Sequence, residues 1–324
     1  MPTPRHPRRG SMQYWPRKRS KHSLARVRSW ADENKAKPLG FIGYKTGMAH
    51  LHVLDNRAKS LTKGEEIFCP TTIVDCPPMT IYGVVFYKKS LSGVRKISSI
   101  MAENLVKELA KKIQLPKKTK KTIDTVSDFD DLRLLVQSNP KLTSSGDKKP
   151  KLIEIALGGS KDDKLQYAKE NLGKEIKIND VFEDGNQLDV HGITIGKGFQ
   201  GTVKRFGVPI RQHKSEKVKR GIGNLGAWTP KRVLFNVPQS GKMGYHLRTE
   251  YNKQLLKIGE DGKEITPKSG LHRYGVVKNS YVLIKGSIVG PKKRAVLLTR
   301  AIRPNSKITK EAAQITHVSV HDKR

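Results

Sequence analysis

Short apolar runs that end at glycine or proline set the pattern of the chain from residue 39 onward. Leu39–Tyr44 and Met48–Leu54 flank the tripeptide Lys45-Thr46-Gly47, which predicts two strands joined by a turn. Many short strands with turn residues between them favour a β-barrel or a β-sandwich as the core of the fold. Comparable runs predict further strands at Thr71–Val74, Ile81–Tyr87, Leu188–Ile195, Tyr281–Val289, Ala295–Thr299 and Ile315–Val320.

The region from residue 90 to residue 175 starts with a helical pattern. Leu105, Leu109 and Ile113 recur every four residues, which predicts a helix with one buried stripe. Pro116 and the lysine-rich run after it end this helix.

The second half of this region mixes helix and strand signals. Ser127 and Asp130 resemble a helix cap ahead of the apolar group Leu132, Leu135 and Val136. The run Leu152–Leu157 predicts a strand. Asp162 resembles the cap of a helix that ends at Gly173. We therefore expect a self-contained α/β insertion between pieces of the β core.

A basic arm precedes the first strand. Its residues, 1–37, contain no acid before Asp32, and its prolines exclude a continuous helix. Tyr14, Trp15 and Trp30 are interleaved with the cations, although a freely solvated tail needs no aromatic side chains. We expect the arm to pack against RNA or against its own domain, and a solvated tail is the alternative.

Residues 196–268 show little regular pattern, and an irregular stretch of this length is uncommon in a compact domain unless it is functional or disordered. The predicted fold is therefore mainly β: a β-barrel with an α/β insertion, a long irregular basic extension and a basic N-terminal arm. The predicted organisation is the arm at 1–37, barrel pieces at 38–89, 176–195 and 269–324 (the last with a C-terminal tail), the insertion at 90–175 and the extension at 196–268.

The net charge of the chain indicates that it binds a partner of opposite charge. The 324 residues include 64 Lys and Arg against 29 Asp and Glu, a formal net charge of +35 at pH 7. Such a charge destabilises a compact chain by self-repulsion and favours a polyanionic partner. Nucleic acid is the first candidate, because each neutralised phosphate releases counterions. A membrane surface is the competing polyanion.

Other features of the composition narrow the class of protein. No apolar run approaches the roughly 20 residues of a membrane span, and the basic N-terminus lacks the apolar core of a secretory signal. Cys69 and Cys76 are the only cysteines and lack the spacing of a zinc site, so we expect two buried, reduced thiols. We expect a cytoplasmic protein with no bound metal and no membrane association.

The stretch Gly196–Lys253 holds the clearest functional signal, because cations, nine glycines and aromatic residues accompany only two acids, Glu216 and Glu250. Glycine lets a backbone approach phosphates closely, Lys and Arg neutralise them, and rings such as Phe199 and Phe206 can stack on unpaired bases. We predict that RNA is bound by Arg5, Arg8, Arg9, Tyr14, Trp15, Arg17, Lys18 and Arg19 in the arm, and by Lys197, Lys204, Arg205, Arg211, His213, Lys214, Lys217, Lys219, Arg220, Trp228, Lys231, Arg232, Lys242, Tyr245, His246 and Arg248 in this stretch.

One glycine pattern has a second interpretation. Gly196, Gly198 and Gly201 match the GxGxxG loop of protein kinases and of dinucleotide-binding folds. The kinase motifs HRD and DFG are absent, and Pro209 is expected to stop the helix that a dinucleotide fold needs after its glycines. We expect no cofactor and no catalytic residue. An enzyme that modifies nucleic acid is the third-ranked class.

Several segments resemble the universal large-subunit ribosomal protein L3 family. They are GKGFQGTVKRFG at 196–207, GIGNLGAWTP at 221–230 and GKMGYHLRTEYNKQLLKIG at 241–259. The opening PRHPRRGSMQYWPRKRS and the run GFIGYKTGM resemble the archaeal and eukaryotic branch, and the chain length favours the archaeal type. The resemblance covers nearly the whole chain, and residues 90–175 contribute little to it.

The resemblance implies a translation-protein-type β-barrel and a structural, non-enzymatic role in the large ribosomal subunit. It implies that the protein binds large-subunit rRNA and nucleates assembly. It also implies that the extension reaches toward the peptidyl transferase centre with Trp228 at its tip, beside the basic stretch Arg211–Arg220. A buried core tryptophan is the competing interpretation of Trp228.

The resemblance also implies the partners and the location of the protein. Large-subunit rRNA and neighbouring large-subunit proteins are the expected partners, without a membrane and without a homo-oligomer. The expected location is the cytoplasmic ribosome. A free-standing basic chaperone that binds nucleic acid is the alternative.

Overall fold

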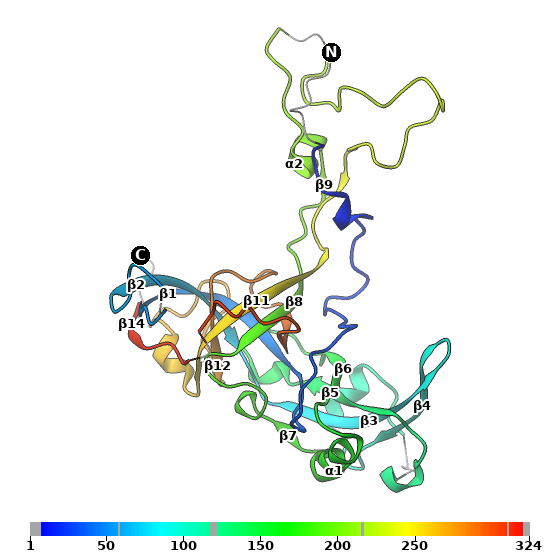
Figure 1. Ribbon diagram of the computed structural model, residues 1–324, viewed down its shortest axis with the longest axis vertical. Helices are drawn as coiled ribbons and strands as arrows, with labels where there is room; N and C mark the ends of the chain where they lie inside the picture. The colour runs from blue at the N-terminus through cyan, green and yellow to red at the C-terminus, as the bar shows by residue number, and fades with distance from the viewer. Residues whose placement is uncertain (1–7, 58, 117–121, 215–216, 310, 320–324) are drawn as a thin grey trace. The chain divides into compact units, whose positions relative to one another are not determined.

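Figure 1 shows the protein as a computed structural model, which describes residues 8–57, 59–116, 122–214, 217–309 and 311–319. The chain divides into two compact units. The smaller unit comprises Met1–His22 and Ile193–Leu247, and the larger comprises Ser23–Gly192 and Arg248–Arg324. The predicted arm therefore divides at residue 22, and its first part belongs to the same unit as most of the predicted extension.

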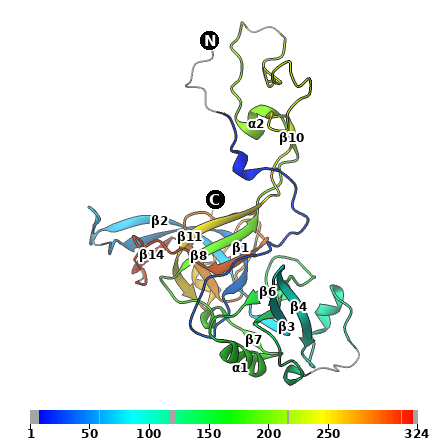
Figure 2. The ribbon, with the colours of Figure 1, turned by 45° about the vertical axis from the view of Figure 1, so that its right-hand side comes forward.

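The larger unit is built around a seven-stranded sheet. Its strand order is β13-β8-β11-β12-β2-β1-β14, and β13 also pairs with β1. The pairings of the first six strands therefore close into a ring, and β14 pairs with the second half of β1 (Figure 1 and Figure 2). The strands are β1 (Gly40–Leu54), β2 (Glu66–Asp75), β8 (Gln187–Ile193), β11 (Leu247–Gly259), β12 (Tyr281–Lys285), β13 (Ala295–Arg300) and β14 (Ile315–Ser319).

A second, antiparallel sheet of five strands belongs to the same unit. Its order is β4-β3-β5-β6, and β7 pairs with β3. The helix α1 (Lys161–Asn171) starts at a capping box, in which Ser160 Oγ accepts from the Asp163 N–H and the Asp163 carboxylate accepts from the Ser160 N–H. The strands are β3 (Met79–Ser90), β4 (Gly93–Met101), β5 (Asp131–Ser138), β6 (Leu152–Ala156) and β7 (Glu175–Ile176), and 3-10 helices lie at Met12–Tyr14, Lys107–Lys111, Ile123–Thr125, Pro140–Leu142, Ile178–Asp180 and Gly262–Ile265.

One hydrophobic cluster joins the two sheets. Phe41 and Ile42 of β1 are completely buried in it, together with Val84 of β3, Leu134 of β5 and Leu297 of β13. Each fully buried side chain of this kind contributes about 1.5–3 kcal/mol relative to exposure. The insertion is therefore not self-contained, because its core is continuous with that of the ring.

Strand pairing changes the structure of two predicted elements, the first hairpin and the second helix of the insertion. Leu39–Tyr44 and Met48–Leu54 lie almost entirely in one strand, β1, and the predicted turn between them is wrong. The first half pairs with β13 from Gly40 to Tyr44, the pairing with β2 runs from Tyr44 to Leu54, and its register shifts between Lys45 and Gly47. Thr46 Oγ1 donates to the Ile73 carbonyl at 3.0 Å. A local irregularity thus replaces the turn.

The second helix predicted in the insertion is wrong, because its apolar group lies in the strand β5. This strand pairs with β3 on one side and β6 on the other, and Leu132, Leu134 and Val136 are completely buried. Burial on both faces removes the alternation that marks a half-exposed strand. The carboxylate of Asp130 accepts from the Lys89 N–H at 2.7 Å and caps no helix.

Of the stripe Leu105, Leu109 and Ile113, only Leu109 lies in a helix, the short 3-10 helix Lys107–Lys111, so the predicted longer helix is wrong. Leu109 alone is completely buried there, and the two flanking residues pack against its cluster at partial exposure. One short helical turn is therefore enough to bury the central residue of the stripe, Leu109.

The remaining predictions are largely confirmed. The strands predicted within β2, β3, β6, β8, β12, β13 and β14 are present, as is the helix α1, although Ser160 and not Asp162 caps it. Cys69 and Cys76 are free and buried. The strand β11 lies inside the stretch predicted to be irregular. The fold is mainly β with antiparallel sheets, as predicted, and the translation-protein type of the barrel stays a prediction.

The described residues contain no helix that is long and apolar enough to span a bilayer.

His191 links three strands of the larger unit. Its Nδ1 lies 2.9 Å from Thr249 Oγ1 and its Nε2 lies 3.0 Å from Thr299 Oγ1. The ring is buried, and burial lowers its pKa below the ordinary value of 6.5. His191 is therefore held neutral as a hydrogen-bonding bridge.

We expect the stability of the larger unit to fall as the pH drops below about 6.5, because the unfolded chain then binds a proton that folded His191 resists. This residue contributes a slope of at most about 1.4 kcal/mol per pH unit. In His191→Gln the melting temperature should depend less on pH, whereas exposed His272→Gln serves as the matched control. Equal pH profiles for the wild type and His191→Gln in thermal melts from pH 5 to 8 would contradict the assignment.

Candidate RNA-binding extension

The smaller unit, here called the extension unit, concentrates positive charge. Its segments Met1–His22 and Ile193–Leu247 contain 18 Lys and Arg and one acid, Glu216. Charges of one sign at this density repel each other unless a partner neutralises them. The unit therefore needs specific internal contacts to hold a structure.

A narrow stem forms the base of the extension unit. The Lys197 N–H donates to the Met243 carbonyl at 2.9 Å, and β9 (Phe199–Gln200) pairs with β10 (Gly241–Lys242). Gly244 has a φ of +78°, and a Cβ there would lie 2.1 Å from the Ile195 carbonyl oxygen. Only glycine fits this close approach of the two chains.

The short helix α2 (Thr202–Phe206) lies above the stem and ends at Gly207, whose φ is +71°. Arg205 links the helix to the returning chain. Its Nε donates to the Lys242 carbonyl at 3.1 Å and its Nη1 donates to the Gln239 carbonyl at 2.8 Å. This predicted RNA contact is thus a structural link within the unit, and burial lowers its pKa.

The N-terminal arm packs against this helix. The Trp15 ring lies 5.8 Å from the Phe206 ring and 5.9 Å from the Phe235 ring, centroid to centroid. The Arg17 guanidinium lies 4.1 Å from the Phe206 centroid, and its Nη1 donates to the Arg205 carbonyl at 2.7 Å. Phe206 is 6% exposed, so it forms the centre of this packing.

Hydrogen bonds join further residues of the arm, up to Ser20, to the extension. Arg8 Nη2 donates to the Asn236 carbonyl at 2.6 Å. The Ser20 N–H donates to the Tyr245 carbonyl at 2.8 Å. His246 Nε2 accepts from the Gly244 N–H at 3.1 Å, which leaves Nδ1 to donate to the Lys18 carbonyl at 2.8 Å.

The arm therefore packs on a remote part of its own chain. Packing on its own chain is one of the two outcomes that the sequence predicted, and the described residues Trp15 and Arg17 are not part of a solvated tail.

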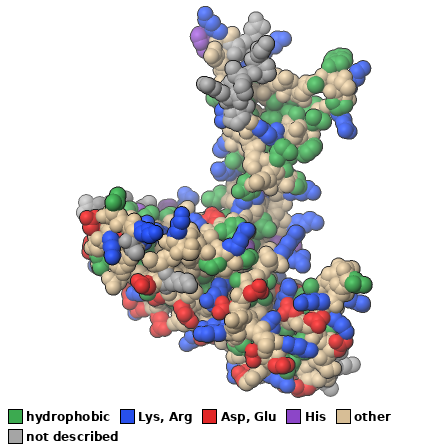
Figure 3. All heavy atoms as spheres, viewed as in Figure 1, with side chains coloured by type: hydrophobic (Ala, Val, Ile, Leu, Met, Phe, Trp, Pro, Cys, Tyr) green, Lys and Arg blue, Asp and Glu red, His purple; other side chains and the backbone are tan. Residues whose placement is uncertain are grey.

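Beyond the stem, the extension is a long exposed loop. Trp228 is 83% exposed, and the Lys231 ammonium lies 5.7 Å from its ring centroid. The core interpretation of Trp228 is therefore wrong. Phe199, Val218 and Phe235 are also exposed. Figure 3 shows basic and hydrophobic side chains interleaved on this part of the molecule, a mixture that marks an interaction surface.

The predicted RNA contacts divide by exposure. Arg5 lies outside the described residues. Trp15, Arg17, Arg205, Tyr245, His246 and Arg248 are partly buried. The exposed members are Arg8, Arg9, Tyr14, Lys18, Arg19, Lys197, Lys204, Arg211, His213, Lys214, Lys217, Lys219, Arg220, Trp228, Lys231, Arg232 and Lys242.

Two residues that organise the unit were missed as structural contacts. Phe206 was expected to stack on bases, and Phe235 was not singled out. The one local signal for Phe206 is its position at the end of α2, directly before Gly207. Their partner Trp15 is too remote in the sequence for any local pattern to reveal the contact.

The glycines at 196, 198 and 201 precede a helix that ends at Phe206, ahead of Pro209. The helix α2 has five residues, however, and β9 pairs antiparallel with β10. A dinucleotide fold needs a parallel βαβ unit at this place. The geometry therefore gives no support to nucleotide binding here.

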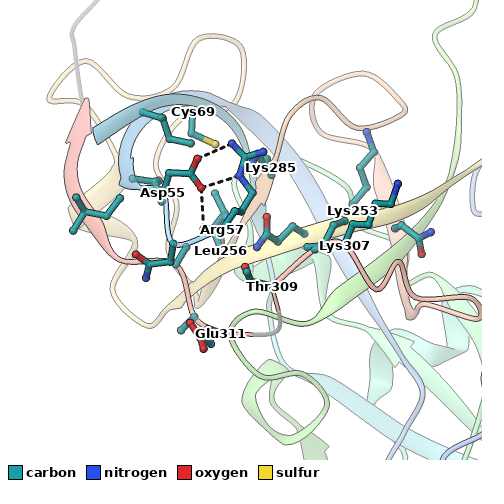
Figure 4. Close-up of a pocket in the computed structure, with 18 residues that line it drawn as sticks. Asp55, Arg57, Cys69, Lys253, Leu256, Lys285, Lys307, Thr309 and Glu311 are labelled. Atoms are coloured by element: carbon teal, nitrogen blue, oxygen red, sulfur yellow. Dashed lines mark hydrogen bonds and ion pairs between the residues drawn. The ribbon is translucent and has the colours of Figure 1, made fainter. Parts of the chain in front are cut away.

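A cavity of about 360 Å³ in the larger unit is a possible enzyme site by its size (Figure 4). The Asp55 carboxylate in it accepts from Arg57 Nε at 2.8 Å, Ser60 Oγ at 2.6 Å and Thr62 Oγ1 at 2.7 Å. These hydrogen bonds, with Arg57 first, hold the pKa of Asp55 well below its usual range, and burial raises the pKa of the Cys69 thiol. A weak base beside a protonated thiol makes no nucleophile pair.

Comparison with known proteins identifies matches along nearly the whole chain. Residues 1–131 and 117–322 match the family described as Ribosomal protein L3. The large ribosomal subunit protein uL3 of Methanocaldococcus jannaschii is 45% identical over 327 residues, which cover 98% of this chain and 97% of that protein. The uL3 proteins of Methanococcus aeolicus (44% identical, 98% and 97% covered) and Methanobrevibacter smithii (42% identical, 98% of both chains covered) are also similar.

We expect Phe206→Ala to release the arm from the extension. Truncation of a buried phenylalanine costs about 3–5 kcal/mol, which raises the open fraction of the unit roughly 100-fold or more. Limited trypsin digestion should then cut at arm arginines much faster, while the thermal melt of the larger unit stays unchanged. Phe199→Ala is the matched control, because Phe199 is 72% exposed in the same unit. Equal cutting rates in both variants would show that Phe206 does not hold the arm.

Proposed function

The chain belongs to the ribosomal protein L3 family, and on this premise we propose that it is an archaeal-type structural constituent of the large ribosomal subunit. Its place is the ribosome of the cytoplasm, its partners are large-subunit rRNA and neighbouring ribosomal proteins, and its role is structural and not catalytic. The ring of strands is a translation-protein-type barrel that serves as a rigid base. The extension unit penetrates rRNA toward the peptidyl transferase centre, and binding of the protein nucleates assembly.

The observation that carries this proposal is the surface of the extension unit. Exposed cations surround exposed aromatic and aliphatic side chains, and Glu216 is the only acid in its sequence. Such a surface suits RNA, because phosphates neutralise the cations and bases cover the rings. The stem and the Phe206 packing keep this surface in a defined shape, so less ordering entropy is lost on binding.

A free-standing basic chaperone would share the charge but would need no fixed place in a particle. Salt distinguishes the two, since a protein that makes six to ten phosphate contacts loses about 10³–10⁵ in affinity between 50 and 200 mM salt. An extension threaded through folded RNA leaves only when the RNA unfolds. The number of copies per large subunit after a high-salt wash therefore distinguishes an integral ribosomal component from a loosely bound chaperone.

We expect one copy of the protein per large subunit in sucrose gradients of a cell lysate, both before and after a wash at high salt. The contacts of the extension unit are enclosed by RNA and should survive the wash. The matched comparison is any loosely bound basic protein in the same lysate, which should move to the top of the gradient. Migration of this protein to the top would overturn the proposal in favour of the chaperone.

We expect Trp228→Ala to reduce translation by assembled ribosomes while the free protein melts at the wild-type temperature. Exposed side chains contribute about 0.5 kcal/mol or less to stability, and Trp228 is 83% exposed with the Lys231 ammonium near its ring. Trp30→Ala is the matched control, because Trp30 packs over Gly40 in the larger unit and its removal should lower the melting temperature. A large drop in stability in Trp228→Ala, or normal translation, would refute this role.

A further inference from the structure

A second basic surface lies on the hairpin that β3 and β4 form at the edge of the five-stranded sheet (Figure 1). Val84, Val85 and Phe86 of β3 are completely buried, but every residue from Lys88 to Ile97 is exposed. Strand β5 pairs with β3 only as far as Tyr87. The outer half of the hairpin, here called the ribbon (residues 88–97), therefore extends beyond the sheet with both faces in solvent. A lone two-stranded ribbon is marginally stable in water.

The charges of the ribbon are all positive. Residues 82–101 contain Lys88, Lys89, Arg95 and Lys96 and no acid. The register places Lys88 directly opposite Arg95, an arrangement of like charges that destabilises a strand pair. Within the described part of the chain, only Lys88 of these four has an ion pair, with Asp128. An anionic partner would relieve the remaining repulsion.

A groove of about 850 Å³ runs along the ribbon, between it and residues 125–128. Arg95, Lys96 and Ser98 line the groove from the ribbon, and Ser127 and Asp128 line it from the facing segment, where Asp128 is ion-paired with Lys88. Ser98 is 7% exposed, and its Oγ has no hydrogen-bond partner among the described residues. A phosphate in the groove would accept hydrogen bonds from the neighbouring Arg95 and Lys96 side chains.

One apolar side chain, that of Leu91, lies at the tip of the ribbon and is fully exposed. Val94 beside the turn and Ile97 at the base of the ribbon are about half exposed. A-form RNA has a wide, shallow minor groove that proteins bind by shape and by contacts to phosphates and 2′-hydroxyls. A basic ribbon with an apolar tip matches this groove, since the cations reach the phosphates on its rims and the tip packs on the sugars.

We propose that the ribbon is a second RNA-binding surface. It binds the phosphate backbone of structured rRNA independently of the extension unit. The inference rests on the proposed function, because it assumes that rRNA is the polyanion within reach. Charge complementarity favours RNA over a protein partner, since the ribbon offers cations on both faces. Its contacts are to backbone and sugar, so the surface recognises shape and not sequence.

The first test measures how the affinity of the purified full chain for large-subunit rRNA depends on salt. The triple variant Lys89→Gln, Arg95→Gln, Lys96→Gln should reduce the slope of log K against log[salt] by about 0.7–0.9 for each phosphate that the protein no longer neutralises. The matched control removes three exposed lysines of the same insertion outside the ribbon: Lys107→Gln, Lys111→Gln, Lys112→Gln. An unchanged slope, or an equal change in the control, would overturn the inference. Failure of the wild type to bind rRNA would instead refute the proposed function.

The second test locates the ribbon in the assembled subunit. Leu91→Cys provides one exposed thiol for a tethered iron chelate, since Cys69 and Cys76 are buried. Hydroxyl radicals from this position should cut the rRNA backbone, and Val106→Cys serves as the control on the neighbouring surface. Subunits that contain the Leu91→Cys protein but show no rRNA cuts from it, with radical damage confined to a neighbouring protein, would replace the RNA partner by a protein.

Discussion

The packing of Phe206 against the N-terminal arm is the contact on which the extension unit depends. The unit has 18 Lys and Arg and one acid, so its own charges oppose compaction. The Phe206 ring attracts the guanidiniums of Arg17 and Arg205 on its surface, and its contact with Trp15 removes apolar area from water. Both arginines also donate to backbone carbonyls. These cations therefore act as structural links where they would otherwise only repel.

The two units handle charge in different ways. In the larger unit, 28 acids accompany 46 Lys and Arg, and pairs such as Lys164–Asp131 and Arg300–Glu33 balance part of the charge inside the unit. The extension unit has almost no acid, so its exposed cations have no such internal balance. The ribbon is one part of the larger unit that also lacks acids of its own. A shared physical criterion, cations without acids beside exposed apolar groups, thus points to both proposed RNA surfaces.

Elements with a clear local period could be predicted, and elements defined by their neighbours could not. The helix α1 has a capping box and a glycine after its end, so local residues specify it. Strand β5 lies between two other strands and has apolar residues on both faces, which hides its period of two. The outer half of β11 is polar and half-buried, so no apolar alternation marks it. Pairing with strands far away in the sequence determines that these two segments are strands.

By itself, the sequence determined the class of partner, the family motifs and the segment that carries the basic extension, because net charge, glycine content and motif order are properties of the chain alone. Tertiary structure decided that the arm folds onto the extension and that Arg17, Arg205 and His246 serve as internal links. It also decided that the insertion shares the core of the ring. The reason is distance along the chain: Arg17 and Arg205 are separated by 188 positions. No local period records a contact between residues so far apart, whereas packing and hydrogen-bond geometry select it once the chain is folded.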